Sequence, residues 1–372
     1  MIQTYSIIKL AMRSVALLGI GIWMVTPVSA QQKTPDPSGY IQKYDSEFDG
    51  IGPRVYILPA PRTKEEQVRD NYMEIASFQD SINRSLQYLR LLESWKTTSN
   101  NATILQLITP APKNTADWNA LIAIYTDTDQ KNPAIATGLL NEYAKIRILQ
   151  KETSQATGIL ESALQEALAQ QNIQDIGVIQ SNLSSLLVYN KNYIDAGRYE
   201  EAYYKQALEN KSIIDQASSL VKIALIQAYD KDYNSAENNI IRKAVPLFNK
   251  AKAYEGKTIA WLVLAEIYQM QNKHTEAQWF LIQARDLALA KNFTNDLAEI
   301  EYMLASSKYI QKNLVISKKE LNLAFDLATK EDNKYLQLAI AEKLGRINLQ
   351  QNKIDEAEKL LEDYWKIRNE LF

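Results

Sequence analysis

The stretch TIAWLVLAEIYQMQNKHTEAQWFLIQARDLALAK, residues 258–291, contains two apolar patterns separated by a short polar turn. On both sides of the turn, large or small apolar side chains recur every three or four residues. This spacing is typical of amphipathic helices that bury one face. Two helices joined by so short a turn pack against each other in antiparallel directions. The stretch therefore predicts a helical hairpin.

The same pattern recurs along the chain at a step of about 40 residues, which indicates a repeat architecture. Small side chains form one column with steps of 40, 40, 41, 40 and 40, namely Ala156, Ala196, Ala236, Ala277, Ser317 and Ala357. A second small column consists of Ala144, Ser184, Ala224, Ala265, Ala305 and Gly345. A large apolar column precedes it, with Tyr143, Leu183, Ile223, Leu264, Leu304 and Leu344. Small residues on both helices of each unit let the backbones approach closely, while the large column fills the space beside them.

Residues 258–291 resemble a tetratricopeptide repeat. Its first-helix signature is matched by Trp261, Leu264, Ala265 and Tyr268, and its second-helix signature by Ala277, Leu281 and Ala284. The last unit agrees through Leu344, Gly345, Ala357 and Leu361, and the unit near Ala156 through Leu160 and Ala163. Departures from the pattern occur at Glu200, Tyr203 and Lys243. The resemblance covers about residues 133–370, and because its step exceeds the usual ~34 residues, it points to a longer-helix variant of the family.

This resemblance implies an all-α, right-handed superhelical solenoid of antiparallel helix pairs, with about six repeats over residues 133–372. In such an array each pair covers its apolar face with its neighbours, and the stack presents a long concave groove. The family implies a non-catalytic adaptor or scaffold without a cofactor, which binds a peptide or helix of a protein partner against the first helices.

The amino terminus has the pattern of an export signal. Lys9 and Arg13 precede an apolar run over residues 15–25, and small residues at 28–30 predict cleavage before Gln31. The run is shorter than the ~20 residues that a spanning helix needs, although an uncleaved anchor is the alternative. No later stretch is apolar enough to span a membrane. We therefore expect a signal peptide at residues 1–30 and a periplasmic or extracellular protein.

Residues 31–132 predict a linker followed by a helical lead-in. Pro and Gly interrupt residues 31–61 so often that we expect a Pro/Gly-rich tether there. Residues 62–132 are the lead-in, in which an apolar stripe from Val68 to Leu89 predicts one long helix or two with a tight turn. A hairpin of degenerate repeats is the favoured interpretation and a coiled-coil dimer the alternative. A shorter helix is expected at about residues 115–125.

Composition and motifs argue against catalysis and against a broad nucleic-acid surface. The chain has no cysteine and one histidine, His274, which falls in a predicted turn, so thiol chemistry and His-rich zinc sites are excluded. No phosphate-binding glycine motif occurs. The net charge of −2 gives no general attraction to nucleic acid. A hydrolase acting through carboxylates alone is the remaining enzymatic hypothesis.

Polar and aromatic residues of the first helices are the candidates for partner binding. An Asn and Lys set in the first three units loosely resembles the carboxylate clamp of some tetratricopeptide proteins, although the order of Asn141 and Lys145 is reversed. The groove candidates are Asn141, Lys145, Asn182, Ser218, Lys222, Glu266, Gln269, Tyr302, Tyr309, Glu342 and Arg346. Mixed polarity with tyrosine suits a protein partner.

Two further surfaces give alternative hypotheses. Five tyrosines cluster in the second unit, at residues 189, 193, 199, 203 and 204, and suggest a carbohydrate-binding or enzyme-accessory module as the runner-up function. The last helix is apolar on more than one side and no capping helix follows it. Trp365, Leu371 and Phe372 are therefore candidates for docking or for homo-oligomer formation.

Overall fold

The computed structural model describes residues 41–42, 55–56, 62–76 and 78–372. The expected signal peptide lies outside these residues, as does most of the 31–61 linker. The chain divides into two compact units, residues 1–63 and 64–372. In the first unit, β1 (Ile41–Gln42) and β2 (Val55–Tyr56) form an antiparallel pair in which Ile41 lies opposite Tyr56. The linker region therefore contains a short strand pair.

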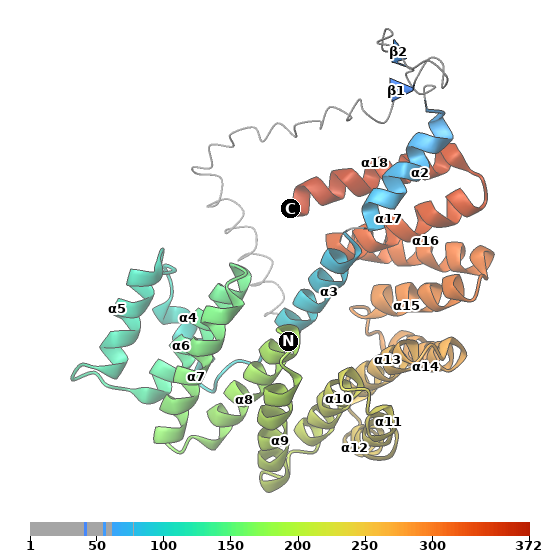
Figure 1. The fold of residues 1–372 in the computed structure, drawn as a ribbon. Coiled ribbons are helices and arrows are strands. Elements are labelled where there is room, and N and C mark those ends of the chain that lie inside the picture. The colour runs from blue at the N-terminus through green and yellow to red at the C-terminus, as the bar shows by residue number, and fades with distance from the viewer. Residues whose placement is uncertain (1–40, 43–54, 57–61, 77) are drawn as a thin grey trace. The chain divides into compact units, whose positions relative to one another are not determined.

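Six helix pairs form the second unit from residue 133 onward (Figure 1). The first helices of the pairs are α6 (Pro133–Leu149), α8 (Ile173–Tyr189), α10 (Ile213–Tyr229), α13 (Tyr254–Met270), α15 (Leu297–Ile310) and α17 (Lys334–Gln350). The second helices are α7 (Thr153–Ala169), α9 (Tyr193–Glu209), the composite α11 (Tyr233–Asn238), η2 (Asn239–Ala244) and α12 (Val245–Ala251), then α14 (His274–Lys291), α16 (Leu314–Lys330) and α18 (Ile354–Leu371). Each helix packs on the next, as the repeat predicts.

The three columns of the repeat form the core between the helices. All six members of the column from Ala156 to Ala357 are buried, and so are all six from Ala144 to Gly345. In the large apolar column only Ile223 is partly exposed. Ser317, which replaces alanine in its column, donates its hydroxyl to the carbonyl oxygen of Ala305 at 2.8 Å, so its buried oxygen is satisfied. The small residues thus set the close approach of each helix pair.

The turns between the helices share one backbone conformation. In residues 133–372 each turn contains a non-glycine residue with φ between 54° and 66°, from Lys151 to Asn352 in steps of 20 or 21. At the first of these turns, the N–H groups of Lys151 and Glu152 donate to the carbonyl oxygens of Ile148 and Arg147. This is the Schellman arrangement, which satisfies the last carbonyls of a helix. Equal turns after helices that are mostly of 17 residues explain the long 40-residue repeat.

The one step of 41 residues corresponds to a π-helical turn. η2 lies in the middle of the third pair's second helix and takes up the extra residue. Pro246 follows it, and a proline inside an α-helix would clash with the carbonyl four residues earlier. The wider π turn relieves this conflict. Lys243, which departs from the family pattern, donates to Asn239 Oδ1 at 2.8 Å within this turn.

The lead-in contains four helices, and the first two do not form the expected hairpin. They are α2 (Lys64–Ala76), α3 (Gln79–Glu93), α4 (Asn101–Leu107) and α5 (Thr115–Thr126), the last as predicted. The apolar stripe exists, but α2 packs on α17 and α18, whereas α3 packs on α17 and α8. The solenoid itself buries the stripe, which periodicity alone could not distinguish from burial in a hairpin. Among residues 62–76 and 78–372, no helix has the length and hydrophobicity needed to cross a membrane.

Candidate functional site

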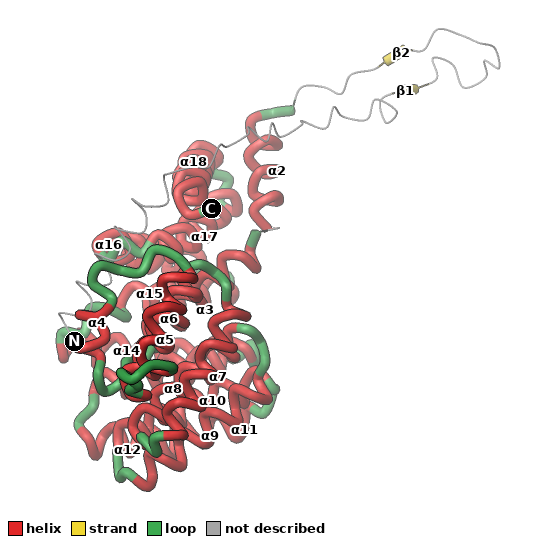
Figure 2. Tube along the Cα trace, turned by 90° about the vertical axis from the view of Figure 1, so that its left-hand side faces the viewer, coloured by secondary structure: helices red, strands yellow, loops and turns green. Residues whose placement is uncertain are grey.

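We call the side of the solenoid formed by the first helices its inner face. The first part of the lead-in, residues 64–100, which contains α2 and α3, is called the lead-in segment. Figure 1 shows α3 between the early pairs and the late pairs. Figure 2 shows the same unit as helices joined by loops, with an extended loop near α3 and α4. Side-chain or main-chain groups of the lead-in segment contact every first helix through these residues: Ile148 of α6, Asn182 of α8, Asp215 of α10, Glu266 of α13, Glu299 of α15 and Arg346 of α17. The inner face therefore holds a segment of its own chain.

Two buried asparagines grip the main chain of this segment at Lys96. The Lys96 N–H donates to Asn182 Oδ1 at 2.9 Å, and Asn182 Nδ2 donates to the Lys96 carbonyl oxygen at 2.8 Å. Asn141 Nδ2 donates to the same carbonyl oxygen at 3.2 Å, and Asn141 Oδ1 accepts a hydrogen bond from Asn182 Nδ2 at 2.8 Å. Both asparagines are fully buried. Both polar groups of one peptide residue are thus recognised by side chains, outside any helix.

The Lys96 ammonium enters an acidic and aromatic site on α9 and α10. Lys96 Nζ lies 2.5 Å from Tyr203 Oη and 3.2 Å from Asp215 Oδ1. Tyr203 and Ser212 each donate a hydrogen bond of 2.6 Å to the Asp215 carboxylate. Burial opposes ionisation of Asp215, but these donors and the ammonium hold its pKa below the ordinary value. The site favours a cation, not the carboxylate that a clamp would hold.

A buried ion pair lies beside this site and explains a departure from the repeat pattern. Glu200 is fully buried on α9, and its Oε2 lies 3.2 Å from Lys222 Nζ. Lys222 also donates to Ser181 and Ser185 of α8 over 2.8–3.1 Å. Burial lowers the pKa of Lys222, against the attraction of Glu200. Glu200 and Tyr203 of α9 thus replace small or apolar residues of the repeat pattern because they form polar contacts with Lys222 and Lys96.

Arg90 of α3 bridges two late repeats. Its guanidinium donates to Glu266 Oε2 at 2.7 Å and to Glu299 Oε1 at 2.9 Å through Nε. Three more carboxylates lie near Glu299, at Glu93 of α3, Asp296 and Glu331. Burial and the charges of Glu299 and Glu255 raise the pKa of Asp296 to about 6, and burial with the charges of Asp296 and Glu299 raises that of Glu331 to about 7. Arg90 therefore compensates part of an acidic region on the inner face.

The end of the solenoid is covered by the start of the lead-in segment. Tyr72 of α2 is buried, donates to the Ala357 carbonyl oxygen at 2.8 Å, and accepts at its own carbonyl oxygen from Arg346 at 3.3 Å. Arg346 also pairs with Glu342. Phe78 meets the Trp365 ring edge to face, with centroids 6.1 Å apart. Trp365 and Leu371 are thus partly covered within the chain, whereas Phe372 is 56% exposed.

The remaining groove candidates differ in how far they are used internally. Gln269 donates to the Met303 carbonyl oxygen and to Ser307 Oγ at 3.0 and 2.8 Å. The Tyr309 hydroxyl accepts from Gln350 at 3.0 Å, and the Lys343 ammonium lies 5.2 Å from the Tyr302 ring centroid. Lys145 and Ser218 are partly exposed and lie one helical turn from Asn141 and Lys222 respectively, on the same helix faces. Lys222 is also partly exposed, but it pairs with Glu200, whereas Asn141 and Asn182 are fully buried.

Several tyrosine rings of the second pair are covered by other side chains. Arg84 lies over the Tyr189 ring at 4.4 Å, and Tyr193 stacks on Tyr229 with centroids 4.9 Å apart. Tyr203 faces Lys96, and Tyr199 packs beside the core of the first pairs. The rings therefore fill spaces between elements of the chain.

His274 is the first residue of α14 and is buried, at 7% exposure. Neither ring nitrogen has a hydrogen-bond partner. In the described part of the chain, no group of three or more His, Asp or Glu residues is arranged to hold a metal ion.

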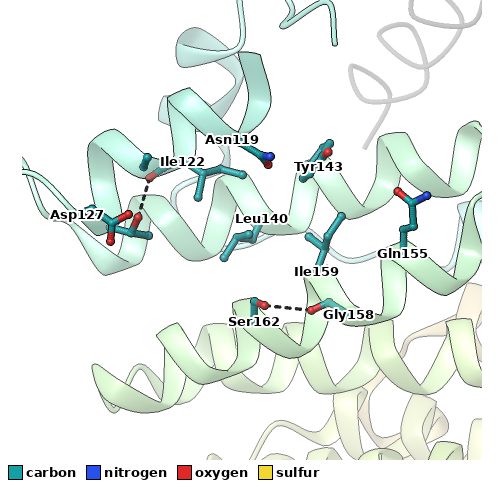
Figure 3. A pocket seen from close by; sticks show the side chains of 11 residues that line it. Asn119, Ile122, Asp127, Leu140, Tyr143, Gln155, Gly158, Ile159 and Ser162 are labelled. Atoms are coloured by element: carbon teal, nitrogen blue, oxygen red, sulfur yellow. Dashed lines mark hydrogen bonds between the residues drawn. The ribbon is translucent and has the colours of Figure 1, made fainter. Parts of the chain in front are cut away.

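A separate pocket of about 410 Å³ lies between α5, α6 and α7 (Figure 3). Ile122, Leu140 and Ile159 form its apolar floor, and Asn119 and Gln155 are among its polar side chains. Gly158 also lines it, and a methyl group added at that glycine would meet no atom within 4 Å. The pocket exists because α5 packs mainly on α6 and leaves α7 uncovered.

Comparison with known proteins identifies the fold. No family model and no curated protein matches the sequence. The apo form of RapI is similar in structure, with a TM-score of 0.54 and 12% identity over 78% of this chain and 98% of RapI. A Rap protein complexed with competence and sporulation factor has a TM-score of 0.50 and 14% identity, over 82% of this chain and 77% of the Rap chain. A signal-transduction ATPase of Pyrococcus horikoshii with a tetratricopeptide repeat sensor has a TM-score of 0.50 and 13% identity, over 82% of this chain and 50% of the ATPase chain. This chain therefore has the fold of the tetratricopeptide-like repeat solenoids.

Proposed function

We propose that the chain is a non-catalytic protein-interaction scaffold whose inner face binds an extended or helical segment of a protein partner. The observation that carries this proposal is the clamp at Lys96, where Asn141 and Asn182 hold the N–H and carbonyl of a non-helical peptide residue. Side chains that recognise the main chain in this way supply a receptor for a peptide. A Rap protein of similar fold is described as complexed with a competence and sporulation factor, which supports the same use of the fold.

We further propose that the scaffold works in the bacterial cell envelope. The support is the signal-like sequence of residues 1–30, in which basic residues precede an apolar run and small residues follow it. A chain without cysteine that is stabilised by packing alone is compatible with this compartment.

Site-specific photocrosslinking in native envelopes tests the proposal. A photoreactive amino acid is placed at Lys145 or Ser218, which are partly exposed one helical turn from Asn141 and Lys222. The control position is Lys205, which is exposed on the second helix α9. We expect one discrete protein to crosslink from positions 145 and 218 and not from 205. Equal capture from all three positions, or capture from 205 alone, would contradict binding on the inner face.

A further inference from the structure

We propose that the inner face of the first three repeats recognises a segment with an aromatic residue, then Lys or Arg, then any residue, then a small residue and then Ser or Thr, and that Trp95–Ser99 is an internal copy of this ligand. The proposal rests on the proposed function and states which partner chemistry the site accepts. A partner segment of the same pattern binds by displacing the internal copy.

The aromatic position is a buried pocket. Trp95 is 9% exposed and packs in the core formed by α6, α7 and α8, next to residues such as Leu140, Leu160 and Leu183. Its indole Nε1 has no hydrogen-bond partner in the protein. The pocket thus selects apolar ring area and makes no use of the indole donor, so Phe in a partner satisfies it as well.

The next position requires a cation. The site around Lys96 presents the Asp215 carboxylate, fixed by hydrogen bonds from Tyr203 and Ser212, and the Tyr203 ring, whose centroid lies 4.5 Å from Lys96 Nζ. The nearby Glu200 adds negative charge that Lys222 offsets. A carboxylate in place of the ammonium would face Asp215 directly and be repelled, so charge gives the site its specificity.

The last two positions accept small residues, and the second of them uses its hydroxyl. Thr98 is 5% exposed against Gly138, where an added Cβ would come within 3.0 Å of the Thr98 hydroxyl oxygen. Ser99 donates its N–H and its hydroxyl to the two oxygens of Asp175, at 2.8 and 3.0 Å. Asp175 is fully buried and held by Asn172, so the acceptor is in place before a ligand arrives.

Displacement is feasible because the internal copy is held through a short stretch. Residues 95–98 form no regular secondary structure. The Lys96 and Asp215 side chains remain 31% and 41% exposed, so a competing ammonium has access to the carboxylate. Because the copy is tethered, it competes at an effective concentration on the order of millimolar. A partner segment therefore needs contacts beyond this motif, or a weakened internal copy, to bind well.

The test uses the labelled peptide ESWKTTSN, which has the sequence of residues 93–100, and the chain from residue 31 to 372. Lys96→Glu in the chain weakens the internal copy by repulsion from Asp215. We expect this variant to bind the peptide at least tenfold more tightly than the wild-type chain does. It is also expected to prefer the peptide at least tenfold over ESWETTSN, and adding Asp215→Asn is expected to remove that preference. No binding, or equal binding of both peptides by a variant with unchanged circular dichroism, would overturn the motif.

A second measurement avoids dependence on the folding of that variant. A peptide with benzoylphenylalanine at the tryptophan position is photolysed at about millimolar concentration with the wild-type chain. Crosslinks on α6 or α8 support the aromatic pocket, and crosslinks elsewhere or none overturn it. If partner capture from positions 145 and 218 succeeds while the peptide tests fail, the interaction function stands and only the motif falls.

Discussion

Gly345 shows how one residue couples the lead-in segment to the repeats. The equivalent positions of the other five pairs carry Ala or Ser, and the buried Tyr72 phenol occupies the space that a Cβ of residue 345 would take. Glycine in a helix interior costs about 1 kcal/mol relative to alanine. Because residue 345 has no Cβ, Tyr72 fits against it and α2 lies directly on α17.

Gly345→Ala is therefore expected to destabilise the chain, against the usual gain from replacing a helical glycine. Overpacking of this kind costs about 1–3 kcal/mol. Gly158→Ala is the matched control, because the added methyl group meets no atom within 4 Å and should raise stability by about 1 kcal/mol. Thermal unfolding followed by circular dichroism measures both. In a Tyr72→Ala background Gly345→Ala should lose its penalty, and a penalty that persists there would refute the role of Tyr72.

Glu331 gives a prediction for pH. Burial and the neighbouring carboxylates Asp296 and Glu299 raise its pKa from 4.5 to about 7. The folded chain therefore binds this proton more tightly than the unfolded chain, and the stability that protonation contributes is lost as pH rises from about 4.5 through about 7. Glu331→Gln should increase the melting temperature above pH 7 and have little effect near pH 4.5. Glu362→Gln, at an exposed position of α18, serves as control. An equal gain at both pH values would contradict this origin.

At the scale of elements, the sequence predicted the helix pairs well because their spacing depends on local patterns. The helices of each pair and the helix at 115–126 follow from residues that are near one another in sequence, and the small columns and the step of 41 follow from the repetition of this local pattern. Where α2 and α3 pack does not follow from nearby residues. Their apolar stripe is compatible with a hairpin, a coiled coil or the inner face, and the contacts that decide, such as Arg90 with Glu266, join residues 176 positions apart. The candidate asparagines were visible in the sequence, but their internal partner Lys96 was not.

The repeated turn is a property of elements and yields its own prediction. Lys231 adopts φ of 66°, a conformation that costs an L-residue roughly 1–2 kcal/mol and glycine almost nothing. Lys231→Gly should raise the free energy of unfolding by about 1 kcal/mol. The strain that glycine relieves in the folded chain exceeds the conformational entropy that it adds to the unfolded chain. Lys205→Gly, at an exposed position inside α9, should lower it by about 1 kcal/mol. Urea titration distinguishes the two, and a loss at both positions would show that the turn is not strained.

At the scale of the whole repeat unit, residues 64–372, α3 acts as a strut between early and late repeats. Tyr88 donates to the Ile148 carbonyl oxygen at 3.0 Å on one side, and Arg90 pairs with α13 and α15 on the other. The two ends of the solenoid also approach each other, since Lys151 Nζ lies 5.5 Å from the Phe372 ring centroid. A binding event that moves the lead-in segment would therefore change the spacing of the repeats, which links occupancy of the inner face to the geometry of the scaffold.

Arg90→Ala should widen the separation between the two ends of the solenoid. The substitution leaves Glu266 and Glu299 without their shared cation beside Asp296 and Glu331, so the carboxylates repel one another and α3 loses its hold on the late repeats. The chain has no cysteine, so spin labels at Gln150→Cys and Asn369→Cys report this separation alone. We expect a narrow distance distribution in the wild-type background, and a longer and broader one with Arg90→Ala. Arg285→Ala removes an arginine that pairs with Glu301 outside the lead-in segment and should leave the distribution unchanged. If Arg90→Ala also leaves it unchanged, the repeats hold their spacing without the strut, and displacing the lead-in segment would not transmit a change along the scaffold.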